Sequence, residues 1–355
     1  MKVVFIIQAE GRGHLTQAIS LYQLLKKNGH DVSAMVIGGS GKKLPSFFTE
    51  SVKTEILSLK TPFLVFKNRE LSLLQTTWMI LRNIGLFIKN LRFLHTFLKA
   101  QKPDLIINFY ESFGGLHQFL YKPVAPMICV GHQYLLLHKA FEHPDGWFQR
   151  FVVNANTRFT AMGAAKKLAL SFDECPNDGD LIVVPPLLRV ELFELQAETK
   201  DFLLAYVTNP ALADEIVAWQ ARNLSVKIEG FWEKPSRIFN ENMVFNEVNG
   251  ALFLEKMRTC KGVVMTAGFE SVCEAMLLGK PAMLMPVPNH YEQACNAKDA
   301  VRAGAGMRCE QFEFEKFIAL IPDYQPVRNL FLAWSQKAEA IFIQEINKIP
   351  TVQTD

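Results

Sequence analysis

The sequence predicts an α/β protein built from two doubly wound, mainly parallel sheets. Three observations support this fold class. The chain has 355 residues, more than one ordinary hydrophobic core needs, which indicates two domains. Short apolar runs bounded by turn residues alternate with helical patterns, as in a parallel sheet covered on both faces. The series of strands stops at Pro185 and Pro186 and then starts again, because a proline pair cannot donate to a sheet ladder.

The expected elements follow in order along the chain. The first half contains expected strands at 2–7, 31–37, 104–109, 126–131, 158–162 and 181–186. The second half repeats the architecture without repeating the sequence, with strands at 202–207, 225–231, 243–248, 262–267 and 281–287. A last helix is expected at 327–341, where apolar residues recur at helical spacing. We therefore expect domains at 1–190 and 191–325, and a C-terminal helix within 326–355 that packs on either domain, the first being one candidate.

Composition and charge exclude several classes of protein. The net charge is only +3 and no lysine-arginine tract occurs, so nothing indicates nucleic-acid binding. The six cysteines are scattered, which fits reduced thiols better than disulfides or a zinc site. The N-terminus enters a strand at Val3 without the pattern of a signal peptide, and no run approaches the ~20 apolar residues of a membrane span. We expect a cytoplasmic protein.

The first glycine turn, "EGRGH", argues against a dehydrogenase. Dinucleotide binding needs G-x-G-x-x-G, and here Gly11 and Gly13 are followed by Thr16 at the third position. The next expected strand, at 31–37, also does not end at an acidic residue. His14 follows the turn where a helix begins, at the edge at which open α/β folds bind ligands. Histidine suits proton abstraction near neutral pH, so His14 is a candidate base; a capping or packing role is the alternative.

A second motif spans residues 264–297. A buried strand ends at Thr266, and Gly268 closes a tight turn into a helix that starts near Phe269. The amides of such a helix start form an anion site suited to a diphosphate. Glu274 lies about one and a half turns into the helix, where a carboxylate can accept both hydroxyls of a ribose. Another helix opens at "HYEQACNA", and we expect its start at the same crevice.

This motif resembles the donor-binding signature of family-28-like glycosyltransferases of the GT-B fold, the family of the N-acetylglucosaminyltransferase that makes lipid II. The resemblance spans nearly the whole chain and includes "EGRGHLTQA", "KPDLIINFYES" and "VVPPLLR". It implies two Rossmann-like domains facing a central cleft, the first on the acceptor side and the second binding the nucleotide sugar. It also implies a nucleotide-sugar donor, UDP by default, and neither a cofactor nor a metal.

The resemblance also assigns roles to residues. Glu274 would bind the donor ribose, and Glu292 and Gln293 would reach the donor sugar. Asn296 would support the helix start, and His14 would be the catalytic base. The donor site implied in this way comprises Gly11, Gly13, Thr266, Gly268, Phe269, Glu270, Ser271, Glu274, His290, Glu292, Gln293 and Asn296. Phe269 and Glu270 stand where the family often has small residues, which leaves the identity of the sugar open.

Other candidates come from the residues alone. Thr208 and Asn209 end a strand at "YVTNP" and are placed to touch phosphates, although Asn209 before proline is equally typical of a helix cap. Glu111 ends the strand "LIINFYE", where it would orient His14 or hold the acceptor; a solvated strand-end acid is the alternative. The histidines at 117, 132, 138 and 143 fit no single helical face, so we expect no metal site.

The predicted reaction is an inverting, metal-independent transfer in which His14 deprotonates an acceptor hydroxyl that attacks the anomeric carbon. The diphosphate leaves toward the helix start at Thr266–Glu270. Two alternatives stay open: an isomerase of the same architecture, like the UDP-N-acetylglucosamine 2-epimerases, and a non-catalytic sugar-nucleotide binder. The products would separate them.

Residues 73–100 predict one long helix with a basic side. Its four cations, Arg82, Lys89, Arg92 and Lys99, fall within an arc of roughly 100°, and the helix has no acidic residue. A cationic amphipathic helix can lie on an anionic membrane surface, which would suit a lipid-linked acceptor. The alternative is a core helix with a solvated basic face.

Overall fold

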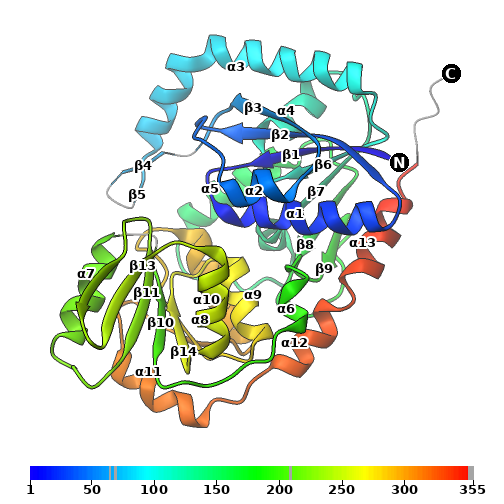
Figure 1. Ribbon diagram of the computed structural model, residues 1–355. Helices are drawn as coiled ribbons and strands as arrows, with labels where there is room; N and C mark the ends of the chain where they lie inside the picture. Colours follow the sequence, from blue (N-terminus) through cyan, green and yellow to red (C-terminus); the bar gives the residue numbers. More distant parts are fainter. Residues whose placement is uncertain (64, 68–69, 208–209, 351–355) are drawn as a thin grey trace. The chain divides into compact units, whose positions relative to one another are not determined.

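The computed structural model describes residues 1–63, 65–67, 70–207 and 210–350. The chain folds into two compact units: unit 1 comprises Met1–Leu188 and the chain from Trp334 onward, and unit 2 comprises Arg189–Ala333. Each unit is a twisted sheet with helices packed against it (Figure 1). The chain passes from unit 1 to unit 2 after Leu188, where the expected boundary is 190. It returns to unit 1 after Ala333, where the expected boundary is 325. The chain returns to unit 1 for its last helix.

Unit 1 contains a parallel sheet of order β3-β2-β1-β6-β7-β8-β9. Its strands are β1 (Lys2–Gln8), β2 (Asp31–Gly39), β3 (Glu55–Lys60), β6 (Leu105–Phe109), β7 (Met127–Gly131), β8 (Lys166–Leu170) and β9 (Leu181–Val184). A separate antiparallel pair joins β4 (Phe66–Lys67) to β5 (Glu70–Leu71). The helices are α1 (Arg12–Lys27), α2 (Ser46–Ser51), α3 (Leu73–Gln101), α4 (Ser112–Leu120), the 3-10 helix η1 (His132–Leu137), α5 (Trp147–Thr160) and α13 (Ala338–Asn347).

The strand order determines where unit 1 can bind a ligand. From β1 the chain crosses to β2 on one side, whereas from β6 it crosses to β7 on the other. Right-handed crossovers in opposite directions place their helices on opposite faces of the sheet. A crevice therefore opens between the carboxyl ends of β1 and β6, the place where doubly wound sheets bind ligands. His14 follows the first of these strands, and Glu111 follows the second.

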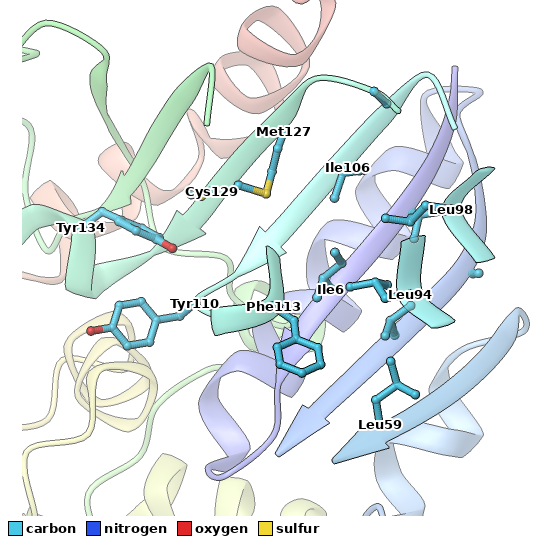
Figure 2. Close-up of a cluster of buried hydrophobic side chains, with 14 of the residues drawn as sticks. Ile6, Leu59, Leu94, Leu98, Ile106, Tyr110, Phe113, Met127, Cys129 and Tyr134 are labelled. Atoms are coloured by element: carbon cyan, nitrogen blue, oxygen red, sulfur yellow. The ribbon is translucent and has the colours of Figure 1, made fainter. Parts of the chain in front are cut away.

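Alternate residues of β1 supply the two faces of the sheet, as the period of a strand requires. Val4 and Ile6 belong to a cluster that includes Leu94 and Leu98 of α3 (Figure 2). Helix α3 has 29 residues and is therefore about 44 Å long, which is longer than the strands beneath it. Its fully buried core residues begin at Phe87, whereas Met79 and Ile80 of the first half are partly buried against the same cluster. The first half extends past the strands at the end where β4 and β5 lie (Figure 1).

Unit 2 repeats the plan. Its sheet has the order β12-β13-β11-β10-β14-β15-β16, with β12 antiparallel to β13 and the other pairs parallel. The strands are β10 (Leu203–Tyr206), β11 (Ile228–Trp232), β12 (Arg237–Asn240), β13 (Met243–Glu247), β14 (Gly262–Met265), β15 (Ala282–Leu284) and β16 (Gly306–Arg308). The crossovers diverge between β10 and β14, so the crevice of this sheet lies at their carboxyl ends.

The helices of unit 2 connect these strands. They are α6 (Glu191–Glu194), α7 (Pro210–Gln220), α8 (Gly250–Thr259), α9 (Phe269–Leu277), α10 (Tyr291–Arg302), α11 (Phe314–Leu320), the 3-10 helix η2 (Ile321–Asp323) and the first part of α12 (Arg328–Ser335). Helix α9 leaves β14 at the crevice, because it follows that strand directly. The fold thus brings the second sequence motif to the ligand-binding edge of its sheet.

Two predictions about the elements are wrong. The expected strand at 158–162 is the end of α5 and a turn, and the strand of that region is β8. The apolar run there favoured a strand, but in the helix Thr160 and the preceding Thr157 face buried tyrosines: Thr157 Oγ1 lies 2.8 Å from Tyr110 Oη and Thr160 Oγ1 lies 3.1 Å from Tyr134 Oη. Burial and these hydrogen bonds outweigh a weak strand preference.

The expected helix at 327–341 is divided into α12 and α13. Leu330, one of the residues in the predicted apolar stripe, is 78% exposed. Trp334, near the end of α12, donates its indole N–H to Ser171 O at 3.0 Å, and after the turn Phe342 of α13 is fully buried. Tertiary packing in unit 1 thus decides where this segment bends.

Candidate active site

His14 lies in the first turn of α1 and is 9% exposed. It does not cap the helix, because the cap residue is Gly11 and no side chain forms a capping hydrogen bond. Instead, its Nδ1 lies 2.9 Å from Gln8 Oε1 and its Nε2 lies 3.1 Å from Gln133 Nε2. The Tyr110 ring is 5.8 Å away, centroid to centroid. The imidazole is therefore held in one orientation at the crevice of unit 1.

Glu111 follows β6 and is 1% exposed, so it is not the solvated strand-end acid that was the alternative. Its Oε1 accepts hydrogen bonds from the Phe113 N–H at 3.2 Å and the Ser112 hydroxyl at 3.0 Å, and it thereby caps α4. Burial raises the pKa of Glu111 to about 7, and these two hydrogen bonds oppose the increase. A carboxyl group of this kind can gain or lose a proton near neutral pH.

The chain makes room for the Glu111 carboxyl group by having no side chain beside it. A Cβ added at Gly38, at the end of β2, would lie 2.4 Å from the Glu111 carboxyl carbon. Nearby, Glu10 Oε1 accepts a hydrogen bond from the Ser40 N–H at 2.5 Å. A small cavity lined by Glu10 and by residues 37–45 lies at the same end of β2. The crevice of unit 1 thus holds His14 and two carboxyl groups at the ends of neighbouring strands.

In unit 2 the crevice is formed by the turn between β14 and α9. Gly268 is the cap residue of α9, so no side chain of its own covers the first amides of the helix. Phe269, Glu270 and Ser271 form the first turn, and the Ser271 hydroxyl donates to Gly268 O at 3.2 Å. Thr266 is 5% exposed at the end of the strand. Backbone amides and the helix dipole here favour a bound anion.

Glu274 is buried on α9, with 6% of its surface exposed, and forms an ion pair with Arg189. Arg189 donates to Glu274 Oε1 from Nη2 at 2.5 Å and from Nε at 3.1 Å. Burial raises the pKa of Glu274, and the Arg189 guanidinium opposes that increase. Both hydrogen bonds end on Oε1, which leaves Oε2 as the oxygen that can accept from a ligand.

Helix α10 supports the same turn from the other side of the motif. Asn296 is 3% exposed, and its amide donates to Ala267 O at 3.1 Å. Gln293 uses its side-chain oxygen to accept from Val287 N–H at 2.9 Å, and His290 caps the helix by accepting from Gln293 N–H. Glu292 lies in the first turn of α10 and is half-buried. The structure therefore joins the α9 start and the α10 start through Asn296.

The remaining predicted residues have different settings. Gly11 is exposed with open space around it, and Gly13 lies inside the first turn of α1. Thr208 and Asn209 lie outside the described residues. His132, His138 and His143 each bond a backbone carbonyl, at 2.7, 2.9 and 3.1 Å. In the described part of the chain no three or more His, Cys, Asp or Glu side chains are grouped as a metal site would require.

Sequence reasoning did not assign roles to three residues that the structure brings to the site. Arg189 occurs in the quoted segment "VVPPLLR", but its partner lies 85 residues away, and only the fold of unit 2 joins them. Gln8 ends β1, and Gln133 lies in η1, 119 residues from His14. A single polar residue at a strand end carries no signal of its partner, so these contacts needed the structure.

Comparisons with known proteins place the chain among glycosyltransferases. A family model described as "Glycosyl transferase family 1" matches residues 1–322. None of the curated proteins matches the chain. In the part of the chain that the structure describes, no helix is both long and apolar enough to cross a membrane.

Three solved structures illustrate the likeness of fold. The spinosyn rhamnosyltransferase SpnG, complexed with thymidine diphosphate, is 15% identical with a TM-score of 0.62, over 98% of this chain and 100% of that one. MurG of Acinetobacter baumannii is 16% identical with a TM-score of 0.59, over 98% and 99%. UGT2 of Phytolacca americana, complexed with UDP-2-fluoro-glucose and pterostilbene, is 12% identical with a TM-score of 0.63, over 98% of both chains.

Proposed function

Because the chain belongs to glycosyl transferase family 1, we propose that it moves a sugar from a nucleotide-diphosphate donor to an acceptor hydroxyl, with inversion at the anomeric carbon and without a metal ion. The chain is a glycosyltransferase of the GT-B fold, with two sheets of the doubly wound type. In this proposal unit 2 binds the donor and unit 1 supplies the catalytic base. UDP is the favoured nucleotide.

The buried Glu274–Arg189 pair carries the donor half of the proposal. A carboxylate that is 6% exposed is costly to bury, and Arg189 offsets this by pairing with one oxygen only. The other oxygen, Oε2, would accept the two ribose hydroxyls. The amides that follow Gly268 would bind the diphosphate and stabilise its charge as it leaves, which requires no metal. The solved structures of SpnG with thymidine diphosphate and of UGT2 with a UDP-sugar support a donor of this class.

The acceptor half of the proposal rests on His14. Its Nε2 would take the proton of the acceptor hydroxyl as the oxygen attacks the anomeric carbon. The bond from that carbon to the diphosphate oxygen breaks at the same time, and the electron pair leaves with the nucleotide diphosphate. Glu111, whose pKa is raised to about 7, would accept a hydrogen bond from the acceptor when it is ionised. His14 thus takes the proton of the acceptor, and the amides that follow Gly268 stabilise the charge of the leaving diphosphate.

Calorimetric titration of UDP, dTDP and GDP into the wild type and Glu274→Ala tests the donor site. Losing a charge-assisted contact to the ribose should weaken binding of the favoured nucleotide about ten- to a hundredfold. Glu255→Ala is the matched control, because Glu255 also pairs with an arginine in unit 2 but lies on α8. Binding that survives Glu274→Ala undiminished would remove Glu274 from the site.

Product analysis with UDP-N-acetylglucosamine and a panel of acceptors tests the reaction. The proposal predicts a new glycoside of inverted configuration, and His14→Gln should abolish its formation. An epimerised donor would identify an isomerase of the same fold, and binding without turnover would identify a non-catalytic binder. Chelation of divalent metals by EDTA should leave the transfer rate unchanged.

We also propose that the first half of α3 docks on an anionic membrane surface and so brings the enzyme to a lipid-linked acceptor. Leu74, Trp78, Leu81, Ile84 and Ile88 are 83, 67, 58, 51 and 47% exposed. At ~100° per residue they fall within an arc of roughly 120°, which overlaps the arc of cations by roughly 60°. Because α3 precedes β6 and runs antiparallel to it, this apolar stretch lies toward the carboxyl edge of the sheet, where His14 is.

Sedimentation with phosphatidylglycerol-containing vesicles tests this docking. A double variant, Trp78→Ser with Leu81→Ser, should reduce vesicle binding at least about tenfold, and raised salt should weaken binding by the wild type. Ile238→Ser is the control, since Ile238 is 77% exposed on β12. Equal binding by the double variant and the control would show that α3 is an ordinary surface helix with a solvated basic face.

A further inference from the structure

We propose that Gln8 is a positioning residue that holds His14 in the tautomer protonated at Nδ1, so that Nε2 is the basic atom. This inference rests on the proposed role of His14 as the base. The contacts that carry it are the 2.9 Å approach of Gln8 Oε1 to Nδ1 and the 3.1 Å approach of Gln133 Nε2 to the imidazole Nε2. Gln8 and Gln133 flank the ring, one at each nitrogen.

The chemistry of the two amides requires one tautomer. A glutamine nitrogen can only donate a hydrogen bond, so His14 Nε2 must accept from Gln133 and therefore carries a lone pair. The proton of the neutral imidazole is then on Nδ1, from which it donates to Gln8 Oε1, an atom that can only accept. The Gln8 contact is the one that holds the Nδ1 proton, because without it the Gln133 amide would turn over and present its oxygen to a proton on Nε2. A neutral histidine with a free choice would divide itself between two forms, of which one has no base at Nε2.

Burial increases the free energy that each of these contacts contributes. His14 and Gln133 are 9% and 8% exposed, so the loss of a partner would not be fully compensated by water. Gly131 leaves room for the Gln133 side chain, since a Cβ added there would lie 2.9 Å from its Oε1. Gln8 is restrained at the end of β1, where it pairs with Gly38 of β2. The imidazole and the two amides are therefore held by β1, α1 and the 3-10 helix η1 rather than by a mobile loop.

The position of Gln133 also indicates where the acceptor arrives. Its N–H donates to the lone pair that a base must use, so an acceptor hydroxyl has to donate from the same direction. The amide then moves aside as the hydroxyl binds. Gln8, on the opposite side of the ring, keeps its contact throughout, because the catalytic proton never reaches Nδ1. These different positions make Gln133 the natural control for Gln8.

The test is a nitrogen-15 NMR spectrum of the whole protein labelled at histidine, without any ligand. The His14 signals are assigned by their disappearance in His14→Gln. The wild type should show the tautomer protonated at Nδ1. Gln8→Leu should shift the population toward a mixture with the other tautomer, whereas Gln8→Glu, which keeps an acceptor oxygen, should preserve the Nδ1–H form. Gln133→Leu, the same change on the other side of the ring, should also preserve it.

Kinetics in the transferase assay supply a second readout. Gln8→Leu should lower kcat about tenfold or more while leaving the KM for the donor unchanged, and Gln8→Glu should restore most of the rate. A wild-type imidazole protonated at Nε2, or an unchanged tautomer in Gln8→Leu, would overturn the inference even if transfer occurs. Conversely, full activity of His14→Gln would refute the proposed base while the NMR result still decides the role of Gln8.

Discussion

Replacing Glu111 by glutamine should change how the stability of unit 1 depends on pH. Burial raises the pKa of Glu111 from 4.5 to about 7 in the folded protein, and the side chain is 1% exposed. The folded state therefore holds a proton that the unfolded state loses between these two values, and folding stability falls as pH rises through that window. The difference between these two pKa values corresponds to about 3 kcal/mol of folding free energy.

The glutamine side chain would keep the hydrogen bonds that cap α4 but would carry no charge. The free energy of unfolding of Glu111→Gln, minus that of the wild type, should therefore increase by about 3 kcal/mol between pH 4.5 and pH 8. Native-state hydrogen exchange at the amides of β6 and α4, corrected for intrinsic pH dependence, measures unit 1 separately from unit 2. Glu55→Gln, an exposed glutamate of β3, is the control. A difference that stays constant within about 1 kcal/mol would refute the argument that Glu111 is protonated by burial.

Three further predictions concern other parts of the molecule. Arg189→Ala should weaken UDP binding about tenfold and cost unit 2 about 2 kcal/mol, less than a fully buried pair would, because the Arg189 side chain is 29% exposed; calorimetry and chemical denaturation measure the two effects. Burial lowers the pKa of His117 to about 4, so wild-type stability should fall by about 3 kcal/mol as pH decreases from 6.5 through 4, and His117→Phe should remove that loss in hydrogen exchange. Gly115→Ala should cost about 2 kcal/mol or more in thermal melts, because its Cβ would lie 2.1 Å from Phe159 O, whereas Gly85→Ala in open space on α3 should be neutral or stabilising.

Hydrophobic patterns predicted most of the fold. A strand such as Val3–Ile7 is apolar throughout because both of its faces are covered, and that is a local property of the chain. The long helix α3 was also predictable, since its apolar residues recur over eight turns. The segment at 158–162 was predicted wrongly, because the hydroxyl groups of Thr157 and Thr160 find buried partners that lie far away in sequence. The secondary structure of such a short segment is determined by these partners more than by its own preference for strand or helix.

The sequence by itself determined the class of protein and the edge at which its chemistry lies. A glycine turn after a strand, followed by a helix, places His14 and the Thr266–Glu274 segment at the carboxyl ends of their strands whatever the rest of the chain does. Spacing along one helix is sufficient for such an argument, because neighbours in the chain stay neighbours in space.

Only the tertiary structure decided how those side chains are held. The pairing of Arg189 with Glu274, the two amides at the nitrogens of His14, and the burial of Glu111 all join residues that the chain keeps apart or depend on what covers them. Protonation and hydrogen-bond geometry follow from this local environment, in which a few ångströms decide whether a charge is paired or buried. The sequence therefore indicates which residue types lie at these strand ends, but the fold sets their protonation and their hydrogen bonds.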